Sequence, residues 1–169
     1  MNTLKLVLLS SLFSVNAWAA TAEVTWHEPE SYRDIRASNE IESRFQARVF
    51  VELEKHFESL AEQLPDNQVL KIVVTDVDLA GEIELQPMNG GLGSLRIVRG
   101  FDFPSMKFSY ELVTAEGEII VQGEERIRGR DVPGKGRPYR RSAGAEQMLA
   151  AEYAMLDRWF RFRFKDELK

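Results

Sequence analysis

The stretch MKFSYEL at residues 106–112 alternates apolar and polar side chains without a break. This period of two is typical of a β-strand that buries one face and exposes the other to water. Glu116 and Gly117 then form a turn signal, and residues 118–127 return as a second strand-like run. We therefore predict an antiparallel hairpin, and with it a sheet that has one wet face.

Three further segments extend this hairpin into a sheet. Residues 69–77 are rich in β-branched side chains, which predicts a short buried strand, and residues 24–26 and 95–98 predict two weaker strands. Residues 78–93, by contrast, carry four glycines and a proline, a composition that favours a long loop. The expected sheet has four or five strands and is mainly antiparallel.

Two amphipathic helices complete the predicted fold. Apolar residues recur every three or four positions from Ile41 to Leu64, which predicts one long helix that ends before Pro65. A second helix is predicted over residues 143–162. Its stripe would consist of Ala145, Met148, Leu149, Glu152, Leu156, Trp159 and Phe160. The predicted fold class is α+β, a four- to five-stranded, mainly antiparallel sheet with two long helices packed on one face.

Composition places the chain among ordinary globular proteins. Its 169 residues suffice for one domain, and 44% hydrophobic residues are enough to bury a core. The absence of cysteine excludes disulfides, thiolate metal sites and a thiol nucleophile. With 22 basic and 27 acidic side chains the net charge is −5, which argues against a general nucleic-acid binder.

Residues 1–20 have the pattern of a secretory signal peptide. Lys5 supplies the positive start, residues 6–15 form a short apolar stretch, and AWA at residues 17–19 places small residues where signal peptidase cleaves. We expect cleavage after Ala19 or Ala20. No cysteine follows the apolar stretch, so we do not expect a lipoprotein.

The remaining residues, 21–169, are predicted to form a single α+β domain. No second apolar run is long enough to span a bilayer, so we expect a soluble mature chain without a transmembrane segment. Export without any cysteine fits a bacterial periplasm, where a domain of this size can fold without disulfides. We therefore expect a periplasmic protein.

Several segments together resemble one family of bacterial exported proteins. They are VTW at residues 24–26, YRDIR at residues 32–36 and, most distinctive, VTDVDLAGE at residues 74–82. In these segments the chain is similar to domain-of-unknown-function family 3016, and the similarity extends over residues 22–164. The resemblance implies an export signal and a single small domain, but it implies no activity.

Asp76, Asp78, Glu82 and Glu84 form the first candidate site. Alternate spacing places Asp76 and Asp78 on one face of a strand end, where two carboxylates can share a hard cation. The spacing does not match an EF-hand calcium loop, and aspartates near a glycine such as Gly81 also cap tight turns. Turn capping, pairing with arginine and metal binding all remain open from the residues alone.

Arg33, Asp34 and Arg36 lie just before the first predicted helix. Guanidinium groups match carboxylates in geometry, so these residues can form an ion-pair network with the acidic segment that begins at Asp76. As a latch, the network would hold the N-terminal segment onto the domain. As a ligand site, the two segments would form its walls.

Residues 126–141 depart most from the acidic composition, with seven basic residues against Asp131 alone. Their prolines and glycines predict a loop, and their charge would attract phosphate-bearing surfaces or acidic proteins. Tyr139 is the single aromatic residue, too few for a single-stranded nucleic-acid site. The candidate anion- or partner-binding residues are Arg128, Arg130, Lys135, Arg137, Arg140 and Arg141.

These patterns predict a non-enzymatic binding or envelope-accessory domain whose partner is an acidic envelope protein or an anionic lipid surface, and not nucleic acid. They include no catalytic motif and no fingerprint of a bound metal or cofactor, so we assign no catalytic residue, metal or cofactor. The alternative is a periplasmic hydrolase or metal-dependent enzyme that uses Asp76, Asp78 and Glu82. Convergence of these carboxylates in a pocket, with a perturbed pKa, would favour the enzyme.

Overall fold

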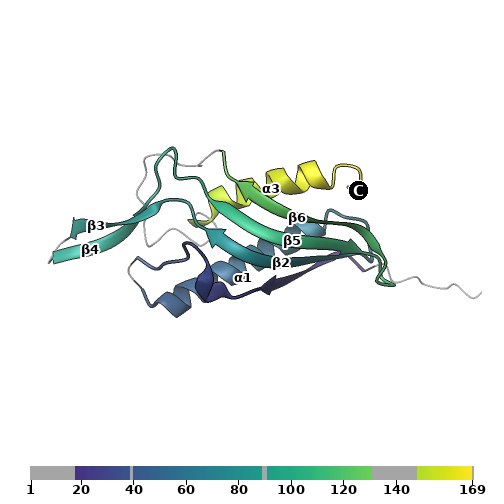
Figure 1. Ribbon diagram of the computed structural model, residues 1–169, viewed down its shortest axis with the longest axis horizontal. Coiled ribbons are helices and arrows are strands. Elements are labelled where there is room, and N and C mark those ends of the chain that lie inside the picture. Colours follow the sequence, from purple (N-terminus) through teal and green to yellow (C-terminus); the bar gives the residue numbers. More distant parts are fainter. Residues whose placement is uncertain (1–17, 39, 89–90, 131–147, 169) are drawn as a thin grey trace, which may run out of the picture.

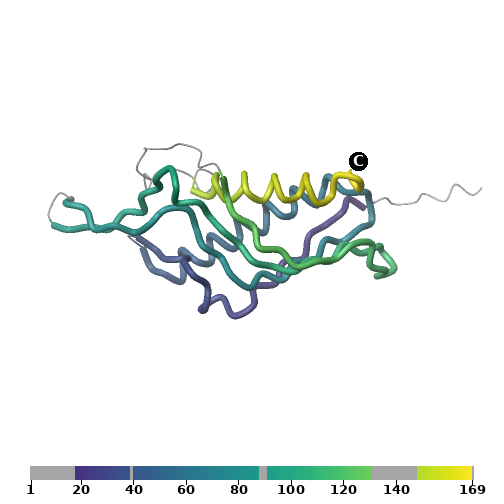
Figure 2. The backbone as a smooth tube through the Cα atoms, turned by 45° about the horizontal axis from the view of Figure 1, so that its top comes forward, coloured from purple at the N-terminus to yellow at the C-terminus, as the bar shows by residue number. Residues whose placement is uncertain are grey.

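The computed structural model describes residues 18–38, 40–88, 91–130 and 148–168. Within these residues a four-stranded sheet forms the body of the protein, and a separate two-stranded sheet projects from one end (Figure 1 and Figure 2). The strands of the main sheet lie in the order β1-β2-β5-β6. Their bounds are β1 Thr21–Trp26, β2 Val69–Asp78, β5 Ser105–Val113 and β6 Ile119–Arg128.

The main sheet is mixed, whereas the sequence pattern predicted a mainly antiparallel one. β1 pairs with β2 in parallel, while β2 with β5 and β5 with β6 are antiparallel. The connection between β1 and β2 explains the difference because it contains the helix α1 (Glu42–Ala61). Such a long crossover returns the chain to the same end of the sheet, as a parallel pair requires. The coarser prediction of an α+β fold is confirmed.

The predicted hairpin is confirmed as the antiparallel pair β5 and β6. Gly117 lies in its turn with a φ of 86°, a conformation that favours glycine. Tyr110 and Gly123 are directly opposite each other across the two strands. A Cβ atom at Gly123 would lie 2.9 Å from the Tyr110 hydroxyl, so the absence of a side chain there makes room for the aromatic ring.

The segment predicted as a loop, residues 78–93, instead contributes to a second hairpin. β3 (Glu82–Met88) pairs antiparallel with β4 (Gly91–Ile97), which begins earlier than the weak strand predicted at residues 95–98. The glycines and the proline indicated a loop, and the segment lacks the apolar alternation that marks a strand. The reason is that this hairpin extends beyond the main sheet (Figure 1) and is not built on a buried apolar face. Leu85 and Leu92 in it are 72% and 74% exposed.

One hydrophobic core joins the helices to the main sheet. Phe57 of α1 lies edge-on against Phe108 of β5, with 6.2 Å between the ring centroids. Trp159 of α3 (Ala150–Arg163) approaches the same ring, with 4.7 Å between centroids. The predicted stripe of the first helix is buried at Phe45, Val49, Leu53, Phe57 and Leu60. Its first predicted residue, Ile41, precedes the helix and is 58% exposed.

α3 corresponds to the second predicted helix, whose first five residues, 143–147, lie outside the described residues. Residues 1–17 of the predicted signal peptide also lie outside them. A short 3₁₀ turn, η1 (Pro29–Ser31), follows β1. In the part of the chain that the structure describes, no helix has the length and apolar character needed to cross a membrane.

Candidate functional site

The N-terminal segment that follows β1 returns to the end of β2. The Tyr32 hydroxyl donates to a carbonyl oxygen of β2 at 2.8 Å, and burial raises the pKa of Tyr32 to about 12. Asp34 then forms a parallel bridge with Asp78. The Asp34 N–H donates to the Val77 carbonyl, and the Asp34 carbonyl accepts from the Leu79 N–H. These bonds bring together the two segments singled out in the sequence.

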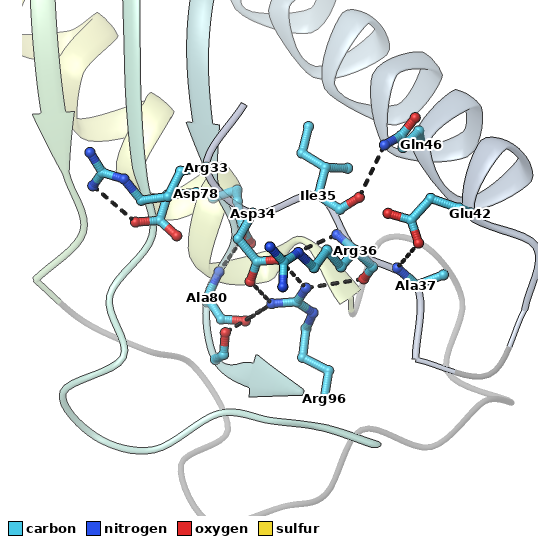
Figure 3. Close-up of polar contacts among 12 residues, drawn as sticks. Arg33, Asp34, Ile35, Arg36, Ala37, Glu42, Gln46, Asp78, Ala80 and Arg96 are labelled. Carbon is cyan, nitrogen blue, oxygen red and sulfur yellow. Dashed lines mark hydrogen bonds and ion pairs between the residues drawn. The ribbon is translucent and has the colours of Figure 1, made fainter. Parts of the chain in front are cut away.

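Arg96 of β4 lies at the centre of this contact (Figure 3). It is 6% exposed, and its guanidinium makes a bidentate ion pair with the Asp34 carboxylate at 2.9 Å and 3.1 Å. The same guanidinium donates to the carbonyl oxygens of Gly81 at 2.8 Å, Arg36 at 3.1 Å and Ala80 at 3.4 Å. The buried positive charge is therefore matched by one carboxylate and three peptide dipoles.

Gly81 allows the chain to turn tightly beside Arg96. Its φ is +82°, and a Cβ atom at this position would lie 2.5 Å from the Ile97 carbonyl oxygen. No other residue type fits without displacing β4. The glycine therefore positions its own carbonyl as an acceptor for the Arg96 guanidinium.

Glu152 of α3 contacts the same turn. It is 1% exposed, its Oε1 accepts the Ala80 N–H at 2.7 Å, and its Oε2 has no hydrogen-bond partner among the described residues. Burial raises the pKa of Glu152 to about 7, although the Ala80 N–H and the Arg96 charge act in the opposite direction. The Glu152 carboxyl therefore exchanges a proton near neutral pH.

Arg33 connects the N-terminal segment to β2 from the exposed side. Its backbone N–H donates to Asp76 at 3.0 Å, and its guanidinium lies 3.6 Å from Asp76 and 3.4 Å from Asp78. Lys107 of β5 lies 3.4 Å from Asp76. Burial raises the pKa of Asp78, and the Arg33 charge opposes that rise. Since the Arg33 side chain is 50% exposed, water weakens these pairs relative to the Arg96 pair.

The structure brings together four of the six residues named for this cluster: Arg33, Asp34, Asp76 and Asp78. Arg36 joins them through its backbone, because its N–H donates to the Asp34 carboxylate at 3.2 Å and its carbonyl accepts from the Arg96 guanidinium. The paired side chains and backbone groups have the geometry of a latch that holds the N-terminal segment against β2 and β4.

Glu82 does not join this cluster. It is exposed and lies on the opposite face of the β3–β4 hairpin from Arg96, because Arg96 pairs with the neighbouring Ile83 and successive residues of a strand face opposite sides. The enzyme hypothesis required Glu82 beside Asp76 and Asp78. Across residues 18–38, 40–88, 91–130 and 148–168, no group of three or more His, Cys, Asp or Glu side chains could hold a metal ion.

Sequence reasoning missed two residues of the latch, Arg96 and Glu152. Arg96 lies 62 positions from Asp34 in the chain, and no local pattern marks it as a partner. Glu152 did carry a signal, since it is the one charged residue in the apolar stripe predicted for the second helix. An acid at a core position indicates a specific buried partner, which here is the Ala80 N–H.

The basic segment 126–141 lies only partly within the described residues. Arg126 and Arg128 are on the exposed side of β6, and Arg130 follows the strand. None of the three has an acidic partner among the residues that the structure describes, and Arg128 lies over the Phe103 ring at 6.0 Å. Lys135, Arg137, Arg140 and Arg141 lie outside the described residues.

Comparison with known proteins gives one match. No curated protein and no solved structure matches the chain. A family model described as "Protein of unknown function (DUF3016)" matches residues 20–162, which include the whole latch and all six strands of the two sheets. The chain belongs to this family of proteins of unknown function, DUF3016.

Proposed function

We propose that the protein is a non-enzymatic binding domain of the periplasm whose basic segment, residues 126–141, engages an anionic surface of the envelope. One observation carries the proposal: Arg126, Arg128 and Arg130 have no acidic partner among the described residues. Side chains with unmatched charge at one end of a sheet attract an oppositely charged partner. Of the two candidate partners, an anionic lipid surface offers this charge at the highest density.

The pairing of the nearby carboxylates argues for binding and against hydrolysis. Asp34 is held by Arg96, and Asp76 and Asp78 share Arg33. Glu152 accepts the Ala80 N–H from a fully buried position. A general acid or a metal ligand must be able to reach a substrate, and these groups are engaged in holding the chain together.

The packing of the helices supports a second part of the proposal. Phe57 of α1 and Trp159 of α3 contact the same Phe108 ring, so we infer that both helices cover one face of the main sheet. Lys107 and Arg126 then lie on the opposite face, which stays accessible to a partner.

We also propose that export ends with cleavage after Ala19 and not after Ala20. Ala20 is 1% exposed and belongs to the hydrophobic core, so its loss would remove a core contact. The Thr21 N–H, the next in the chain, donates to the Gln68 carbonyl. Intact-mass measurement of the exported protein should give a chain that begins at Ala20. A chain that begins at Thr21, or one that retains the first 19 residues, would contradict this part of the proposal.

The experiment is vesicle co-sedimentation of the mature chain at low and physiological salt. We expect binding to vesicles that contain anionic phospholipid, no binding to neutral vesicles, and weaker binding as salt rises. Substituting Arg137→Ser, Arg140→Ser and Arg141→Ser together should lower the affinity about a hundredfold, since each basic residue near an anionic membrane contributes about 1 kcal/mol.

A matched control is the triple substitution Arg44→Ser, Lys71→Ser and Lys165→Ser. These exposed residues lie elsewhere in the chain, and their removal changes the net charge by the same amount. Equal losses of binding in the two triple variants would show that net charge alone is responsible. Unchanged binding in the first variant would exclude the basic segment as the site.

A further inference from the structure

The exposed face of the main sheet has a regular arrangement of charge. In its first rows, Glu23 of β1, Lys71 of β2 and Glu111 of β5 are neighbours across the strands, so positive and negative groups alternate. Further along the sheet, Lys107 of β5 lies directly opposite Arg126 of β6. The two halves of this face therefore differ: in one half, charges of opposite sign are neighbours, and in the other half, two cations are side by side.

Two like charges directly opposite each other on a sheet destabilise it unless a counter-ion is present. Asp76 supplies one for Lys107, at 3.4 Å. Arg126 has none among the described residues. The next residue of β6 on this face is Arg128, so the excess positive charge continues along the strand.

A groove lies over this pair of strands. Its volume is about 430 Å³, and Lys107, Arg126, Thr75 and Ser109 line it together with Phe108, Glu124 and Glu125. The Ser109 hydroxyl makes no hydrogen bond to a described residue and is available as a donor. Two cations and a free hydroxyl around one groove match an anion that has several acceptor oxygens.

We infer that Lys107 and Arg126 form a site for a phosphate group on the open face of the sheet, with Ser109 as a further donor. This deepens the proposed function and rests on it, because it names the chemical group that the basic end of the protein recognises. Phosphate fits better than a carboxylate, since its oxygens can accept from both cations and the hydroxyl at once. Glu124, in the adjacent row beside Ser109, repels the anion and confines it to the Lys107–Arg126 end.

Titration of the isotope-labelled mature chain with inorganic phosphate, followed by backbone NMR at constant ionic strength, tests the site. We expect saturable shifts at the amides of Lys107, Ser109 and Arg126. Arg126→Gln should weaken the affinity about tenfold, because one charge-assisted contact is lost. Lys71→Gln is the matched control: it removes one positive charge from the same face, where two glutamates flank it, and should leave the affinity unchanged.

Glu124→Gln, in the same groove, should change the phosphate affinity in the opposite direction to Arg126→Gln. Removing this repulsive carboxylate should tighten phosphate binding, although it changes no donor. Absence of shifts at these three amides, or equal losses in Arg126→Gln and Lys71→Gln, would overturn the inference.

Vesicles that contain anionic phospholipid distinguish the source of the phosphate. Loss of both vesicle and phosphate binding in Arg126→Gln would identify a lipid headgroup as the ligand. Phosphate binding without vesicle binding would keep the site, assign it to a free phosphate compound, and contradict the proposed envelope function. Vesicle binding that needs Arg137, Arg140 and Arg141 but is unaffected by Arg126→Gln, with no phosphate shifts, would overturn the site and leave the proposed function standing.

Discussion

Arg96 and Arg126 are the same residue type in two regions of one small domain, and their surroundings are opposite. Arg96 is 6% exposed and reaches one carboxylate and three carbonyl oxygens. Arg126 is exposed, lies beside Lys107 and has no acidic partner among the described residues. An arginine whose guanidinium donates to acceptors within the protein, such as Arg96, stabilises the fold. An arginine that has no acidic partner in the described part of the chain, such as Arg126, is available to bind an external anion.

The largest effect on stability is expected from substitution of the buried arginine, Arg96. Arg96→Leu leaves Asp34 charged and without its partner, which typically costs about 3–5 kcal/mol of unfolding free energy. Arg126→Leu makes the same chemical change at an exposed position and should change stability by less than about 0.5 kcal/mol. Urea unfolding of both variants measures the difference. Similar losses in the two variants would contradict the division between buried and exposed arginines.

The buried carboxyl of Glu152 should make the free energy of unfolding depend on pH. Its folded-state pKa, about 7, exceeds the ordinary value of 4.5, so its stabilising contribution is complete below pH 4.5 and is lost as pH rises to 7. Glu152→Gln cannot ionise and keeps an oxygen for the Ala80 N–H. It should therefore match the wild type at pH 4 and exceed its stability at pH 8 by about 3 kcal/mol.

Unfolding free energies of both proteins, measured from pH 4 to pH 8, provide the test. Glu152→Ala is the control, because it leaves the Ala80 N–H without an acceptor and should be less stable than the wild type at pH 4. A constant difference between Glu152→Gln and the wild type across this range would mean that the Glu152 carboxyl does not titrate there.

Arg33 resembles Arg96 in having acidic partners and resembles Arg126 in being exposed to water. Its side chain is 50% exposed, and it pairs with Asp76 and Asp78 at 3.6 Å and 3.4 Å. Arg33→Gln should cost at most about 1 kcal/mol, since water screens such pairs. The loss should shrink further at high salt, which the Arg96→Leu loss should not. A cost as large as that of Arg96→Leu would contradict the difference between the exposed and the buried ion pairs of the latch.

The sequence predicted the parts of the fold that depend on local periodicity. The apolar stripe of α1 and the alternation of β5 both follow from spacing, and both are buried as expected. The direction of β1 was not predictable in this way, because side-chain alternation is the same in parallel and antiparallel strands. The β3–β4 hairpin was missed because its exposed strands, with Pro87 and Gly93, do not alternate around a core.

The candidate site divides along similar lines. The acidic and basic residues at 33–34 and 76–78 were identified because they cluster in the chain. Arg96 was not, since it reaches its partner only after β4 folds back beside the N-terminal segment. The Lys107–Arg126 pair was also hidden, because it depends on the register of β5 and β6 and not on either strand alone.

The phosphate site at Lys107 and Arg126 is tested most directly by urea unfolding of three proteins, the wild type, Arg126→Gln and Lys71→Gln. Each is measured with and without phosphate at equal ionic strength. A ligand that binds the folded state stabilises it, so phosphate should raise the urea midpoints of the wild type and Lys71→Gln by the same amount. In Arg126→Gln most of this increase should disappear. Its midpoint without phosphate should stay at or slightly above the wild-type value, because the repulsion between Lys107 and Arg126 is removed. An equal increase in all three proteins, or a large loss of stability in Arg126→Gln without phosphate, would contradict the proposal that Arg126 is an exposed phosphate-binding residue.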